Sequence, residues 1–130
     1  MEIFEIMAWV AGAIAVAGLI ALTSRIENPT NLSWLIPAGL SVAFLGWSLW
    51  AIALEGPTGF WPVHAKSAWG NQVWFDLLLA VSIAWYLILP RAREVGMRVW
   101  LWLLMVVSSG SIGLLAMLAR YLFLSEKQTA

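Results

Sequence analysis

Asp76 is the residue whose type and position in this sequence most clearly require a chemical explanation. It lies within an apolar run over residues 73–89, whose other side chains suit the interior of a membrane. A carboxylate at the centre of a membrane helix costs about 2.5–3.5 kcal/mol on insertion scales, so such groups face other helices or water and usually have a partner. We therefore expect Asp76 to belong to a structural or functional polar site.

Arg120 is the expected partner of Asp76. It interrupts the last apolar run, residues 99–124, about as far from the polar tail at Ser125 as Asp76 lies from the start of its own run. If the two runs form antiparallel neighbouring helices, both charges lie at the same depth. A buried ion pair, which can be bidentate, would then offset the cost of burying either charge alone. The sequence predicts that this pair locks two helices together.

Two further polar residues precede Asp76. Gln72 lies one helical turn before it and can share its helix face, and His64 lies in the preceding loop. Because histidine titrates near neutral pH, His64 and Asp76 could perform acid–base chemistry on a lipophilic substrate. Asp76 could instead carry protons or cations, although a neighbouring arginine argues against proton release. Nothing in the sequence fixes the distance between His64 and Asp76.

The composition identifies the class of protein. Hydrophobic residues make up 62% of the 130 residues, charged residues make up 11%, and the mean hydropathy is +0.87. Soluble domains are about 45–50% apolar and about 25% charged, so lipid must be the solvent for much of this chain. A formal net charge of zero gives no electrostatic basis for binding nucleic acid. The absence of cysteine and the single histidine argue against a metal centre.

Four apolar runs are long enough to cross a membrane, over residues 3–23, 32–54, 73–89 and 99–124. About 20 such residues cross a hydrocarbon core of ~30 Å. We therefore expect an all-α membrane protein in which one domain, residues 1–130, forms four transmembrane helices in an antiparallel bundle. The first run follows acidic rather than basic residues, so we expect a retained helix rather than a cleaved signal peptide.

Tryptophan is unusually frequent, with ten residues in the chain. Most lie near predicted helix ends, as in the aromatic belt of a membrane interface. The connection over residues 55–72 contains two prolines, so it cannot be one continuous helix. We expect an interfacial loop there, and the alternative is a lid over a site between the helices. Trp47, Trp50 and Trp85 lie deeper and could pack against helices, face lipid or line a flat apolar ligand.

Small residues recur on single faces of three predicted helices, a pattern that lets membrane helices approach closely. They are Ala8, Gly12 and Ala15 in the first, Gly39, Ala43 and Gly46 in the second, and Ser109, Gly113 and Ala116 in the last. These faces are expected to pack against other helices.

A basic turn between the last two predicted helices carries Arg91, Arg93 and Arg98. Short basic connections lie on the cytoplasmic side, so we expect both termini to lie outside. The same arginines are candidates for binding anionic lipid headgroups. The absence of a targeting extension favours a prokaryotic plasma membrane.

Four short segments of the carboxy-terminal half carry a resemblance to known families. Its parts are Asp76-Leu77, then Ala92-Arg93-Glu94-Val95-Gly96-Met97-Arg98, then Gly110-Ser111-Ile112-Gly113-Leu114-Leu115, and finally Arg120. In these residues the chain resembles an uncharacterised bacterial family of small four-helix membrane proteins. It is also distantly similar to the plant membrane proteins needed for neoxanthin formation, whose last helices carry a comparable glycine-rich segment. That second similarity implies a role related to carotenoids or terpenoids.

Three functions follow as hypotheses. The first is an accessory or structural subunit of a larger membrane complex, or a self-associating protein, that contacts partner helices, lipid, quinone or carotenoid. The alternative is a membrane-embedded enzyme of the isomerase or cyclase type, acting on a lipophilic terpenoid or carotenoid with Asp76, Arg120 and His64 near its site. The third is a small ion- or proton-coupled transporter.

Overall fold

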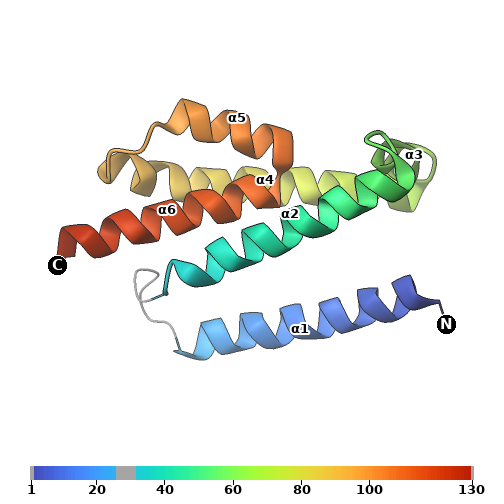
Figure 1. Cartoon of the computed structure of the whole chain (residues 1–130), viewed down its shortest axis with the longest axis horizontal. Coiled ribbons are helices and arrows are strands. Elements are labelled where there is room, and N and C mark those ends of the chain that lie inside the picture. Colours follow the sequence, from blue (N-terminus) through green and yellow to red (C-terminus); the bar gives the residue numbers. More distant parts are fainter. Residues whose placement is uncertain (1, 26–31, 130) are drawn as a thin grey trace. The chain divides into compact units, whose positions relative to one another are not determined.

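The computed structural model describes residues 2–25 and 32–129, and these residues form helices without any strand. The all-α prediction is therefore confirmed for the described part of the chain. In order, the helices are α1 (Ile3–Arg25), α2 (Leu35–Glu55), α3 (Phe60–Ala65), α4 (Ala68–Glu94), α5 (Val99–Ser109) and α6 (Ser111–Thr129) (Figure 1).

The chain divides into two compact units, Met1–Leu32 and Ser33–Ala130. The first unit contains α1, whose apolar residues lie on every face, as expected for a helix surrounded by lipid or by other helices. Near its end, the Thr23 and Ser24 hydroxyls donate hydrogen bonds to the carbonyls of Leu19 and Ile20, at 2.7 and 2.9 Å. These bonds satisfy polar groups without help from water.

Three of the described helices are long and apolar enough to cross a membrane: Ile3–Ser24, Leu35–Glu55 and Ala68–Glu94. They identify the chain as a membrane protein. The third is α4, whose 27 residues extend about 40 Å, so its ends pass beyond a ~30 Å hydrocarbon core.

Helix α4 extends past both ends of the run predicted at residues 73–89. It begins earlier because Ser67 caps it, accepting the Gly70 N–H at 2.9 Å. It continues through Pro90, where the apolar run ends and the sequence predicted a stop. Proline fits the helical φ, but it donates no hydrogen bond to the Tyr86 carbonyl and its ring crowds that carbonyl. The helix ends in a Schellman motif, in which the Met97 N–H donates to the Ala92 carbonyl at 3.0 Å and Gly96 has φ 76°.

The predicted fourth helix is wrong: residues 99–124 form two helices, not one. The chain turns at Gly110, whose φ of 60° and ψ of −119° suit a residue without a Cβ. Helix α5 has 11 residues and extends about 16 Å, which is too short to cross a membrane. Helix α6 then folds back along α5 (Figure 1). Gly113 permits this approach, because a Cβ there would lie 2.8 Å from the Met105 carbonyl.

Helix α6 is the central element of the second unit, where it contacts α2, α4 and α5. The buried apolar side chains described are Met117, Ala119, Tyr121 and Leu122 from α6, Val106 from α5, Pro37 from α2, Ala92 near the end of α4, and Met97 just after it. Helix α2 runs antiparallel to α6. The Trp34 and Phe123 rings meet edge-on at 5.5 Å, and the Ser41 hydroxyl donates to the Ile112 carbonyl at 2.9 Å.

The reversal at Gly110 also sets the direction of α6. Helices α4 and α6 run in the same direction (Figure 1). The carboxyl-terminal end of α6 therefore lies at the same end of the second unit as the basic segment with Arg91, Arg93 and Arg98, which we call the arginine turn. The sequence expectation placed that end opposite the arginine turn, because it assumed one continuous last helix.

Candidate functional site

Within the predicted loop at residues 55–72, the short helix α3 meets the start of α4 in a tight corner. Gly70 determines how closely the two helices approach, because a Cβ there would lie 2.1 Å from the Val63 carbonyl oxygen. The Asn71 side-chain amide donates a hydrogen bond of 2.5 Å to the His64 carbonyl. This bond satisfies a backbone acceptor at the end of α3, where the helix itself offers no donor.

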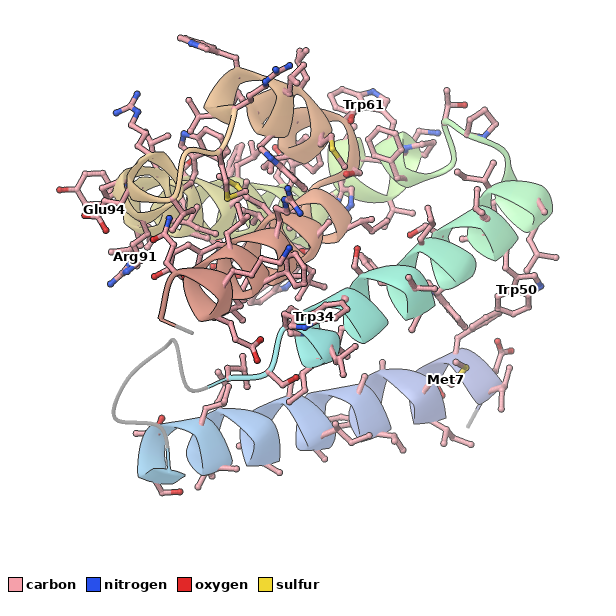
Figure 2. All side chains as sticks on the ribbon, turned by 60° about the vertical axis from the view of Figure 1, so that its left-hand side comes forward. Met7, Trp34, Trp50, Trp61, Arg91 and Glu94 are labelled. Atoms are coloured by element: carbon pink, nitrogen blue, oxygen red, sulfur yellow. The ribbon has the colours of Figure 1, made fainter. Side chains whose placement is uncertain are left out.

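Four rings gather at this corner, and we refer to Phe60, Trp61, His64 and Trp74 as the aromatic corner. The His64 ring centroid lies 5.3 Å from that of Trp74, and the Phe60 and Trp61 centroids lie 6.1 and 6.4 Å from Trp74. Trp61 lies at the α3 end of the second unit (Figure 2). Trp74 and Phe60 each contact the other three rings of the cluster.

Among the sequence-predicted candidates, His64 has a buried side-chain polar atom that lacks a hydrogen-bond partner. Its Nδ1 is buried and has no hydrogen-bond partner, while the residue as a whole is partly buried. A buried N–H without an acceptor is costly, so we assign the ring proton to Nε2 and leave Nδ1 as a bare acceptor. The imidazole presents a flat face to the neighbouring rings.

Asp76 and Gln72 lie on α4, and both are exposed in the structure. Neither has a hydrogen bond or an ion pair within the described part of the chain. Neither side chain is buried within the described part of the chain, and the role of Asp76 and Gln72 in a polar site stays a prediction. On an exposed face of a spanning helix, a carboxylate is expected to contact water, headgroups or a partner chain.

Arg120 is also exposed, and its Cζ lies 5.7 Å from the centre of the Phe123 ring rather than beside Asp76. The predicted ion pair is not formed between these two described residues. The prediction assumed antiparallel helices, but α4 and α6 run parallel (Figure 1). Similar distances of Asp76 and Arg120 from the ends of their apolar runs therefore no longer place the two charges at the same depth. Among the described residues, no hydrogen bond or ion pair joins Asp76, Arg120 and His64 to one another.

The arginine turn lies at the opposite end of α4 from the aromatic corner. Arg91, Arg93 and Arg98 are all exposed, and Arg91 Nη1 donates to the Leu87 carbonyl at 2.7 Å. Arg91 and Glu94 project outward from the end of α4 (Figure 2). The reversed α6 brings Lys127 to this same end, which sequence reasoning missed (Figure 1).

Sequence reasoning also missed the aromatic corner as a unit. A signal was present: Phe60 and His64 are four residues apart, and Ser67 is a good N-cap for a helix that carries Trp74. Among the residues that the structure describes, no group of three or more His, Cys, Asp or Glu side chains could hold a metal ion.

No protein-family model, curated protein or solved structure matches this chain. The resemblances to the bacterial family and to the plant neoxanthin-formation proteins therefore stay predictions.

Proposed function

We propose that the protein is an accessory subunit of a larger membrane complex and packs its spanning helices against those of a partner protein. The observation that carries this proposal is an exposed small-residue face on α2, formed by Gly39, Ala43 and Gly46. A Cβ on either glycine would meet no other atom within 4 Å. In lipid, such faces let helix backbones approach closely, which is the main source of helix association there.

The position of this face relative to the rest of the second unit supports the proposal. Pro37 and Ser41 are the buried residues of α2, and Ser41 bonds to α6. At 3.6 residues per turn, the small-residue face lies on the opposite side of α2 from these two residues. The second unit therefore packs on one side of α2 and leaves the other side smooth.

The far half of α2 adds apolar anchors. Ser41 is level with the start of α6, so α2 continues beyond α6 toward α3 (Figure 1). In this half, the Trp47 and Trp50 rings meet edge-on at 4.8 Å, and the Trp47 side chain is exposed. Exposed tryptophans are common anchors of protein interfaces.

Purification of the full chain in mild detergent tests the proposal. We expect another membrane protein to co-purify at fixed stoichiometry. Gly46→Leu should reduce the amount of co-purified partner by at least about five-fold, because the added side chain separates the closely packed helix backbones. Leu45→Phe is the matched control, since it adds volume at an exposed position away from the small-residue face. Recovery of the chain alone, in every mild detergent tried, would overturn the proposal.

A second candidate function, an enzyme acting on a lipophilic terpenoid or carotenoid, is favoured by the aromatic corner. Flat conjugated ligands stack on such rings, and His64 Nδ1 is an unused acceptor beside them. The test is the absorption spectrum of the purified protein and of its organic extract. A bound pigment or terpenoid that is lost in His64→Phe, with the melting temperature unchanged, would place the ligand at the aromatic corner. Its conversion into a different product by the purified protein would favour the enzyme over the subunit.

A further inference from the structure

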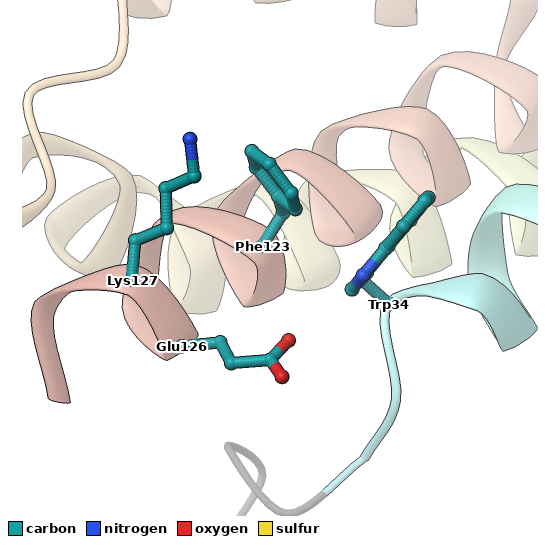
Figure 3. Close-up of a pocket in the computed structure, with 4 residues that line it drawn as sticks. All are labelled: Trp34, Phe123, Glu126 and Lys127. Carbon is teal, nitrogen blue, oxygen red and sulfur yellow. The ribbon is translucent and has the colours of Figure 1, made fainter. Parts of the chain in front are cut away.

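An open pocket lies where α2 begins and α6 ends, lined by Trp34, Phe123, Glu126 and Lys127, with a volume of about 300 Å³. Phe123 stands between Trp34 and Lys127, and the Glu126 carboxylate lies on the Trp34 side (Figure 3). The pocket thus combines two aromatic rings with one negative and one positive side chain.

The positive side of the pocket is gathered on Phe123. The Lys127 Nζ lies 4.6 Å from the centre of the Phe123 ring, and the Arg120 Cζ lies 5.7 Å from it. Attraction to the ring holds each cation at Phe123, and of the two only Lys127 lines the pocket. The Lys127 ammonium is a charged donor that suits a phosphate group.

The other side of the pocket suits a cation. The edge-on arrangement of Trp34 and Phe123, at 78° between ring planes, resembles part of the aromatic cages that bind ammonium groups. The Glu126 carboxylate adjoins it and can accept several hydrogen bonds at once, so an ammonium can join any bond it already makes. The same carboxylate repels a ligand that carries only negative charge.

The location of the pocket identifies the source of such a ligand. Trp34 immediately precedes Leu35, where the spanning helix α2 begins, so it lies at the depth of the headgroups. The arginine turn lies at the same end of the second unit (Figure 1). A phosphate and an ammonium joined by a short linker are the headgroup of an amine-bearing zwitterionic phospholipid.

We propose that this pocket binds the headgroup of an amine-bearing zwitterionic phospholipid, with the phosphate at Lys127 and the ammonium between Glu126 and Trp34. The proposal is independent of the partner of α2, because the pocket and the small-residue face are separate surfaces. It predicts that the protein prefers an amine-bearing zwitterionic lipid to an anionic lipid, whereas a purely basic surface would prefer the anionic lipid.

The test uses the full chain in nanodiscs that contain equal amounts of phosphatidylethanolamine and phosphatidylglycerol in phosphatidylcholine. After gentle detergent extraction, the retained lipids are counted by mass spectrometry. We expect the wild-type chain to retain phosphatidylethanolamine over phosphatidylglycerol. Lys127→Gln should lower its retention about five-fold, as for the loss of one basic contact at a membrane surface. Glu126→Gln should remove the preference for the amine-bearing lipid.

Two controls make the result specific. Arg93→Gln and Glu94→Gln change charges at the same end of the molecule but outside the pocket, and should leave the preference unchanged. Both pocket substitutions are at exposed positions, and the melting temperature checks that the fold is kept. Enrichment of phosphatidylglycerol, or of neither lipid, would overturn the proposal. Added soluble phosphoethanolamine should not displace the retained phosphatidylethanolamine. Full displacement would also overturn the proposal, because the site would then recognise a free metabolite as well as it recognises a lipid.

Discussion

Gly70 brings α3 closer to α4 than any residue with a side chain would allow. A Cβ at this position would lie 2.1 Å from the Val63 carbonyl oxygen, which is backbone and cannot move aside cheaply. The aromatic corner depends on this approach, because it holds His64 and Phe60 over Trp74.

Gly70→Ala should therefore destabilise the corner. We expect it to lower the free energy of unfolding by about 1–3 kcal/mol, the usual cost of overpacking, and to change the tryptophan fluorescence. Thermal unfolding in detergent measures the first effect. Gly46→Ala is the matched control and should be neutral or stabilising, because its Cβ would meet open space in a helix. Equal behaviour of the two variants would contradict the close approach.

His64 offers a second test at the residue scale. Because its buried Nδ1 has no partner, replacing the ring by an apolar ring of similar shape removes an unsatisfied acceptor. His64→Phe should leave the melting temperature unchanged or raise it, whereas His64→Ala should lower it by leaving a cavity among the rings. A marked loss of stability in His64→Phe would show that Nδ1 does have a partner.

At the scale of elements, the hairpin of α5 and α6 decides how the second unit packs. Near the end of α5, the Ser108 and Ser109 hydroxyls both donate hydrogen bonds to the Met105 carbonyl, at 3.0 and 2.6 Å. Gly110 then reverses the chain, and the buried face of α6 fills the space between α2, α4 and α5. The most polar of the long helices thus forms the core.

Gly110→Ala should weaken this hairpin. A Cβ is strained at φ 60° and ψ −119°, and strain of this kind costs about 1–3 kcal/mol. We expect a lower melting temperature and faster proteolysis within α5, measured beside Gly39→Ala, whose helical position carries no such strain. An unchanged or higher stability would mean that residues 99–124 form one continuous helix in the membrane.

At the scale of the whole molecule, the absence of cysteine permits a direct test of sidedness. Helix α4 separates Lys66 from Arg93, and the α5–α6 hairpin returns Gln128 to the end that holds Arg93 (Figure 1). We expect single cysteines at Arg93 and Gln128 to react with a membrane-impermeant maleimide from the same side. A cysteine at Lys66 should react from the opposite side. Labelling of Gln128 together with Lys66 would restore the four-span topology.

The sequence by itself determined the class of protein and most of its helices. Long apolar runs can satisfy their backbone groups in lipid only as helices, so the first three spans follow from length and composition. The boundaries of α4 were less accurate, because Ser67 extends the helix at one end and Pro90 does not stop it at the other.

Only the tertiary structure decided which charged residues meet. The pairing of Asp76 with Arg120 depended on the direction of α6, and one glycine conformation at Gly110 reverses that direction. An apolar run with small residues has the same hydropathy whether it crosses the membrane once or folds back on itself. The sequence thus supplied the charges, while the backbone at Gly110 placed Arg120 and Lys127 beside Phe123 and left Asp76 exposed on α4.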